Sequence, residues 1–117
     1  MRAAYRDYIG STDWQARRRT WHAAWIDRHG TRPTCQACDA PWALSRGDLH
    51  HRTYARLGAE LFDDLVPLCR ADHAALHDIL ETAAGWRHLG RPAATAGIIA
   101  ILRRLHRADA ADLGQLW

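Results

Sequence analysis

Four histidines lie close together in the middle of this 117-residue sequence, at positions 50, 51, 73 and 77. His50 and His51 are adjacent, His73 and His77 are spaced i, i+4, and Asp63-Asp64 lies between the two pairs. Neutral imidazole is a common metal ligand and a common general base near neutral pH. On a helix, His73 and His77 would share one face, close enough to bind one metal ion. The cluster therefore predicts a metal site with one further histidine available as a base.

A second group contains the residue types that bind zinc. Cys35 and Cys38 form a C-x-x-C pair, and Cys69 lies three residues before Asp72. Zinc accepts sulfur ligands and, less often, carboxylate oxygen, so these four residues could form a tetrahedral structural site. The fourth position stays open, because Asp72 could instead be a helix N-cap, and water or another histidine could complete the site. The absence of any structural metal is the remaining alternative.

The elements expected to hold these residues are short. Residues 48–54 and 65–68 have the composition of two strands, with Pro67 acceptable only at an edge or bulge. Residues 72–84 have the apolar spacing of a helix, and Gly85 is placed to end it. We therefore expect a short hairpin followed by a helix that carries His73 and His77.

Helices are also expected on both sides of this core. Thr12 and Gln15 have the spacing of a capping box, and a helix is predicted from about 13 to 29, ended by Gly30. Its tryptophans recur at helical period, which is more typical of a core face than of a base-stacking surface. They are Trp14, Trp21 and Trp25.

Residues 86–117 predict a C-terminal helical extension. Pro92 can open a helix, and apolar residues follow at helical spacing until Asp109 interrupts the pattern. A last short turn is expected to contain Leu113, Leu116 and Trp117. We interpret this helix as a packing element. Arg103, Arg104 and Arg107 on its other face are candidates for phosphate contacts, although a solvated face is the commoner meaning of such a group. Histidines outside the central cluster are expected to be surface or core residues: His22, His29, His88 and His106.

Composition favours one domain spanning residues 1–117. All 16 basic residues are arginine, and with 13 acidic residues the formal charge is +3. Arginine suits phosphate binding, although an arginine-rich sequence can equally reflect a GC-rich genome. No signal peptide or membrane span is predicted. The odd number of cysteines fits metal binding in the cytoplasm better than a disulfide framework.

Three segments together resemble the HNH endonucleases, and the similarity covers about residues 5–81. They are Leu49-His50-His51, then Asp63 to Cys69 (DDLVPLC), then His73-x-x-x-His77. The resemblance implies an α+β fold with a ββα-metal core, at about residues 31–84, in which a β-hairpin and a helix hold one metal ion. It also implies a metal-dependent hydrolase that nicks or cleaves DNA. RNA is a further candidate substrate.

The resemblance implies a role for each residue of the motif. His50, His73 and His77 would bind a divalent metal (Mg, Mn, Ni or Zn) that stabilises the phosphorane and the leaving group. His51 would be the general base. Asp64 stands where the family has an asparagine that fixes the hairpin loop and the base.

The same resemblance implies a nucleic-acid partner, most simply double-stranded DNA. Arg52, Arg56 and Arg70 flank the motif and are candidates for phosphate contacts, and Arg17 and Arg18 are secondary candidates. Ordinary solvated charge is the alternative for each of them.

Two other functions remain open: a non-catalytic, zinc-stabilised module that binds nucleic acid or assists a larger machine, and a purely structural zinc domain. A structural site has no need of His51, whereas hydrolysis needs a base, so the enzyme is favoured.

Overall fold

A two-stranded hairpin lies at the centre of the structure, a computed structural model that describes residues 2–115, apart from the side chains of residues 2, 87 and 112–115. In chain order, the elements are α1 (Arg2–Ile9), α2 (Thr12–His29), β1 (Gly47–His51), the 3-10 helix η1 (Phe62–Asp64), β2 (Leu65–Cys69), α3 (Arg70–Thr82), the 3-10 helix η2 (Ala84–Leu89) and α4 (Arg91–Gln115).

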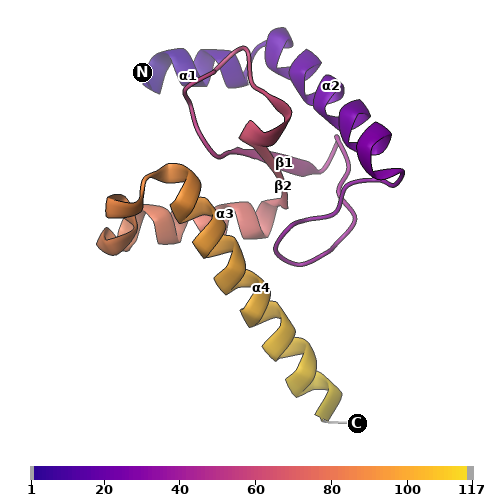
Figure 1. Ribbon diagram of the computed structural model, residues 1–117, viewed down its shortest axis with the longest axis vertical. Helices are drawn as coiled ribbons and strands as arrows, with labels where there is room; N and C mark the ends of the chain where they lie inside the picture. The colour runs from indigo at the N-terminus through magenta and orange to yellow at the C-terminus, as the bar shows by residue number, and fades with distance from the viewer. Residues whose placement is uncertain (1, 116–117) are drawn as a thin grey trace.

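The hairpin is antiparallel, and helices pack on both of its faces. β1 pairs with β2 so that His50 lies opposite Val66 and His51 lies opposite Leu65. α1 and α2 lie on one side of the hairpin, whereas α3 and α4 lie on the other (Figure 1). The described residues thus form a small α+β fold with one hairpin and four α-helices, which confirms the predicted class.

Strand alternation decides which histidine faces which layer. Successive side chains of a strand point to opposite faces, and both faces of this hairpin are buried. His51 stacks on Trp14 of α2, with ring centroids 5.0 Å apart. His50 meets His73 of α3 on the other face, with centroids 5.4 Å apart. Two adjacent residues therefore belong to two different layers of the molecule.

Each layer has its own apolar core. The core beneath α2 is aromatic and consists of Trp14, Trp21, Trp42, Leu49 and Leu65. The core between β2, α3 and α4 contains Cys35, Ala37, Val66, Leu68, Leu76, Ile98, Ile99 and Leu102. Trp14 and Trp21 are buried, so the tryptophan spacing of α2 does mark a core face.

The N-cap of helix α2 lies one residue earlier than predicted. The N-cap is Ser11, whose side chain accepts a hydrogen bond from the backbone N–H of Trp14, so the predicted capping box at Thr12 is wrong. Gly30 ends the helix as predicted, in a left-handed conformation with φ of 71°. The segment before the cap, for which no helix was predicted, is the helix α1.

The boundaries on the other side of the hairpin also differ from prediction. β1 ends at His51 instead of residue 54, and α3 runs from Arg70 to Thr82, before Gly85. Asp109 does not end α4, because an Asp can be tolerated inside a helix and α4 continues to Gln115. The predicted last turn is therefore wrong at Leu113, and its remaining residues, Leu116 and Trp117, lie outside the described residues.

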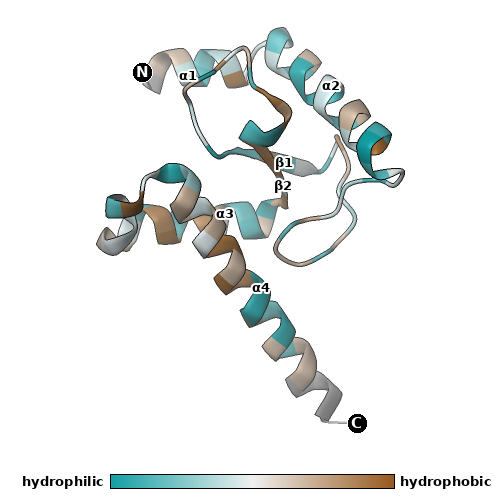
Figure 2. Cartoon of the chain, viewed as in Figure 1, coloured by the Kyte–Doolittle hydropathy of each residue, from teal (hydrophilic) through white to brown (hydrophobic). Residues whose placement is uncertain are grey.

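Helix α4 extends beyond the rest of the molecule (Figure 1), whose longest dimension is 48 Å. Its apolar residues are concentrated in the half next to α3, and its far half is more hydrophilic (Figure 2). Among the described residues, no helix combines the length and apolar character needed to cross a membrane.

Candidate metal centres and general base

Three histidines from two elements form the first metal-binding group. His50 comes from β1, and His73 and His77 come from successive turns of α3. Each offers a nitrogen, and these nitrogens lie within 4.8 Å of one another. The Nε2 atoms of His73 and His77 are 3.0 Å apart. The structure therefore brings together the three residues that the sequence predicted as ligands.

The outward nitrogens of two of these rings have partners of their own. Nε2 of His50 lies 2.9 Å from Oγ1 of Thr95, and Nδ1 of His73 lies 3.0 Å from a carboxylate oxygen of Asp48. Nδ1 of His50 is buried without a hydrogen-bond partner. Ligand histidines in metalloproteins characteristically use one nitrogen for the metal and the other for such an outer partner.

The electrostatics of the group favour neutral imidazole. Burial, together with the positive charge of Arg91 and the neighbouring histidines, lowers the pKa of His50 to about 2. Burial and the nearby His73 also lower the pKa of His77. Two facing nitrogens and an unpartnered third form a donor set that fits a divalent metal with open positions.

His51 is placed differently from the three ligands. Its ring is only 2% exposed and lies among Trp14, Tyr5 and Tyr54. Its Nε2 is 2.7 Å from Oε2 of Glu60, and its Nδ1 has no hydrogen-bond partner. Burial lowers the pKa of His51, and the hydrogen bond and charge of Glu60 partly oppose that shift. A carboxylate thus holds one nitrogen, and the other is buried with no hydrogen bond that would occupy its lone pair.

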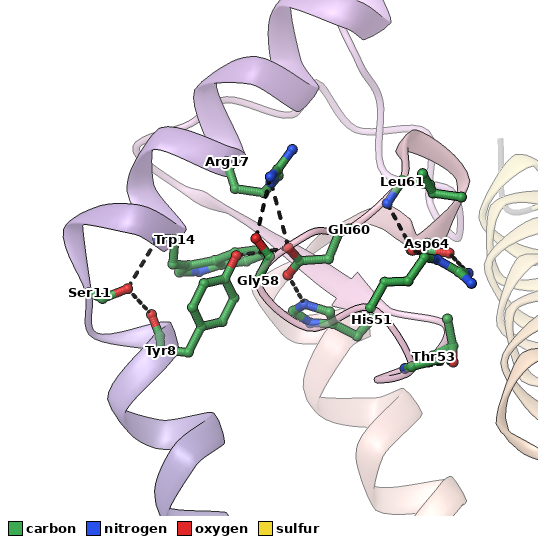
Figure 3. A network of polar contacts seen from close by, with 12 residues as sticks. Tyr8, Ser11, Trp14, Arg17, His51, Thr53, Gly58, Glu60, Leu61 and Asp64 are labelled. Atoms are coloured by element: carbon green, nitrogen blue, oxygen red, sulfur yellow. Dashed lines mark hydrogen bonds and ion pairs between the residues drawn. The ribbon is translucent and has the colours of Figure 1, made fainter.

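Glu60 is the functional residue that sequence reasoning missed. It is buried in the loop between the strands, and its Oε1 accepts a hydrogen bond of 2.8 Å from the hydroxyl of Tyr8. Arg17 approaches the same oxygen at 3.7 Å. Figure 3 shows Glu60 between the ring of His51 and the side chains of Tyr8 and Arg17. No spacing rule connects these residues, because they come from a loop and two helices.

Asp64 fixes the loop between the strands and forms no hydrogen bond with His51. Its carboxylate forms a two-pronged ion pair with Arg56, whose Nε lies 2.7 Å from Oδ2, and accepts the backbone N–H of Leu61 at 2.9 Å. The hydrogen bond from Arg56 lowers the pKa of Asp64. Glu60 is therefore the carboxylate that is hydrogen-bonded to His51, while Asp63, the other acidic residue of the motif, is exposed.

The second metal-binding group is the one predicted from the cysteines. Ligand atoms of Cys35, Cys38, Cys69 and Asp72 all lie within 4.8 Å of one another. Oδ2 of Asp72 is 3.3 Å from Sγ of Cys35 and 3.2 Å from Sγ of Cys69. The N-cap of α3 is Cys69, so the alternative interpretation of Asp72 as the cap is wrong. Three sulfurs and one carboxylate oxygen fit a tetrahedral zinc site.

His106 contacts this second group. Its Nε2 lies 2.7 Å from Oδ1 of Asp72, on the carboxylate oxygen that does not face the sulfurs. Burial raises the pKa of Asp72, but hydrogen bonds from His106 and the cysteine thiols outweigh burial, and the pKa is lowered. Burial raises the pKa of Cys38 to about 12. His106 was expected to be an ordinary surface or core residue, and the structure shows that it contacts the candidate zinc ligand.

The five candidate phosphate-binding arginines outside α4 lie in different surroundings. Arg18 donates to the backbone oxygens of residues 44 and 47, Arg17 approaches Glu60, and Arg56 pairs with Asp64. Arg52 is half-buried. The side chain of Arg70 is 72% exposed, and its Nε lies 3.8 Å from a carboxylate oxygen of Asp48. Arg70 is therefore the candidate with the most accessible guanidinium.

A cavity of about 370 Å³ adjoins the histidine group. His73 and Asp48 lie at its wall, and Arg70 lines it as well. Tyr5 and Trp14, which pack around His51, also line it. The cavity therefore touches one residue of the metal group, His73, and two neighbours of His51.

Comparison of the chain with protein-family models, with characterised proteins and with solved structures found no match.

Proposed function

We propose that this chain is a metal-dependent endonuclease of the HNH type that hydrolyses phosphodiester bonds in DNA. One observation carries the proposal: adjacent residues of β1 divide between a three-histidine metal group and a carboxylate-held fourth histidine. A zinc site with a purely structural role needs no such fourth histidine. Metal-assisted hydrolysis of a phosphodiester uses a metal ion as the Lewis acid and a side chain as the general base.

His51 is the proposed general base, acting through Nδ1. Glu60 accepts the Nε2–H, which leaves the lone pair on Nδ1 to take a proton from the attacking water. The carboxylate then stabilises the imidazolium that forms, as it does in other carboxylate–histidine pairs. Tyr8 and Arg17 hold the carboxylate in place.

A divalent metal bound to His50, His73 and His77 would stabilise the negative charge that develops on the phosphate and on the leaving oxygen. Imidazole donors suit zinc and nickel better than magnesium or manganese. The cysteine group is proposed to hold a structural zinc. Arg70, beside the cavity that adjoins His73, is the proposed contact for a neighbouring phosphate.

The mechanism requires water to reach a nitrogen that the structure buries. Nδ1 of His51 is enclosed, and the rings of Tyr5 and Tyr54 lie 5.9 and 5.6 Å from the imidazole, centroid to centroid. Both tyrosines are only partly buried, so they are the rings that must shift when substrate binds. The same burial favours the second candidate function, a zinc-stabilised nucleic-acid-binding module that does not cut.

The test is incubation of the purified protein with supercoiled plasmid and Mg, Mn, Ni or Zn, with EDTA as the metal-free control. Nicking should require metal and fall by at least roughly 100-fold in His51→Ala and in His73→Ala. His88→Ala removes an exposed histidine outside both groups and should nick like the wild type. Metal-dependent DNA binding without nicking by the wild type would support the non-catalytic module instead.

A further inference from the structure

Helix α4 contacts both metal-binding groups through side chains separated by about three helical turns. Thr95 contacts His50, and His106 contacts Asp72. We propose that α4 supplies outer-shell partners to both sites: Thr95 selects the nitrogen of His50 that faces the metal, and His106 fixes Asp72 as the fourth ligand of the cysteine site. This inference rests on the metal binding proposed above and extends it to a helix outside the motif.

Among the described residues, Thr95 is the only hydrogen-bond partner of the His50 ring. The threonine is fully buried, and its Oγ1 lies 2.9 Å from Nε2, while Nδ1 has no hydrogen-bond partner. A neutral imidazole carries its proton on one nitrogen only. Donation of Nε2–H to the hydroxyl leaves a lone pair on Nδ1, whereas the other tautomer would bury an N–H without an acceptor. Thr95 therefore favours the ligand form of His50.

His106 acts on a carboxylate whose two oxygens have different surroundings. Oδ1 of Asp72 meets His106 at 2.7 Å, and Oδ2 meets the sulfurs of Cys35 and Cys69. With Oδ1 engaged, the carboxylate presents a single oxygen to the sulfur side. That is the arrangement of a ligand with one metal-facing atom and one outer partner.

Arg103 of α4 also contacts the loop that carries Cys35 and Cys38. Its Nη1 donates to the backbone oxygen of Gln36 at 2.6 Å, and its guanidinium pairs with Asp39. Gln36 lies inside the C-x-x-C turn, and Asp39 follows the turn with a left-handed φ of 65°. The helix thus holds both the turn that carries Cys35 and Cys38 and the carboxylate that completes the site.

The test of Thr95 compares Thr95→Val, which keeps the shape and removes the hydroxyl, with Thr95→Ser, which keeps the hydroxyl. In metal-free protein, nitrogen NMR of the His50 ring should show the proton on Nε2 in the wild type and in Thr95→Ser, and a changed tautomer population in Thr95→Val. Cobalt titration should show roughly 10- to 100-fold weaker binding at the histidine site in Thr95→Val.

The test of His106 compares His106→Ala with His106→Gln, whose amide can still donate to Asp72. Cobalt bound to thiolates absorbs in a charge-transfer band that a three-histidine site lacks, so the two sites are titrated separately in one sample. His106→Ala should weaken the thiolate site roughly 10-fold or more, and His106→Gln should restore most of the loss. Each alanine or valine variant should leave the other site unchanged, which makes each the control for the other.

The outcomes separate this inference from the proposed function. Wild-type cobalt affinity at the histidine site in Thr95→Val, or at the thiolate site in His106→Ala, overturns the corresponding role. A wild-type His50 protonated on Nδ1 also overturns the role of Thr95. If the wild type binds no metal but shows the expected tautomer, the metal proposal fails, and the tautomer selection by Thr95 stands.

Discussion

A carboxylate partner gives a histidine a fixed tautomer and a more basic free nitrogen. In this chain that partner is Glu60, which lies 2.7 Å from Nε2 of His51. Asp64, which occupies the motif position, is instead paired with Arg56. The resemblance implies that one residue fixes both the loop and the histidine. In this structure Asp64 holds the loop and Glu60 holds His51.

Glu60→Gln should slow cleavage by roughly 100-fold, because the imidazolium loses its counter-charge. The acid limb of the pH–rate profile should also move to lower pH. Burial lowers the pKa of His51, whereas the hydrogen bond and charge of Glu60 raise it. Removal of the charge should therefore keep the imidazole neutral down to a lower pH. The measurement is kcat/KM against pH for the variant and the wild type.

The matched control is Asp64→Asn, which removes the other carboxylate beside the hairpin. It should lower the free energy of unfolding, since the pair with Arg56 is lost, and should leave the acid limb closer to its wild-type position. An unshifted acid limb in Glu60→Gln, with a shifted limb in Asp64→Asn, would contradict the assignment.

The sequence predicted the positions of individual residues correctly where neighbouring residues in one helix or turn determine the geometry. The His73–His77 pair and the C-x-x-C pair are fixed by helix and turn geometry, so sequence spacing alone brings their ligand atoms together. Glu60 reaches His51 from the loop between the strands, where Tyr8 of α1 and Arg17 of α2 meet the same carboxylate. Contacts of that kind depend on tertiary packing, and the sequence carries no periodic signal for them.

At the scale of elements, caps and apolar period located α2, α3 and the hairpin to within a few residues. α1 was missed because it has eight residues, too few for local signals to make a helix stable in isolation. Its stability comes from packing: Tyr8 contacts Trp14, and Tyr5 contacts His51. The predicted strand and helix ends erred where loops and short 3-10 turns replace regular structure.

Gly47, at the start of β1, lies so close to the side chain of Trp42 that a larger residue would clash with it. A Cβ at this position would lie 2.1 Å from Nε1 of Trp42, which is buried and donates to the backbone oxygen of Asp48. Gly47→Ala should therefore destabilise the protein by about 1–3 kcal/mol. Gly85→Ala is the control, since its Cβ would meet no atom within 4 Å. Equal urea midpoints for the two variants would contradict the packing argument.

At the scale of the whole molecule, the cysteine group joins parts that are distant in the chain. Cys35 and Cys38 come from the loop after α2, Cys69 and Asp72 from the junction of β2 and α3, and His106 from α4. In a chain of 117 residues, a metal bound at this junction would supply stability that a small core cannot.

Cys35→Ser should therefore lower zinc content by about one ion and the free energy of unfolding by about 3 kcal/mol or more. For a domain of this size, that corresponds to a fall of roughly 10 °C in Tm. Calorimetry with parallel metal analysis measures both quantities. His73→Ala, which alters only the histidine group, should change Tm much less, and an unaltered zinc content in Cys35→Ser would refute the structural site.

His50 and His51 lie on opposite faces of β1, so the covalent geometry of the backbone fixes the distance between them. One trans peptide unit, about 3.8 Å between α-carbons, sets the offset between the residue that would bind metal and the residue that would move a proton. This distance is set by covalent bonds, so it stays constant on heating, whereas distances between packed helices can change. Insertion of one residue between His50 and His51 would turn one of the two side chains to the other face of the hairpin. This part of β1 should therefore tolerate substitution of neighbouring residues far better than a change in length.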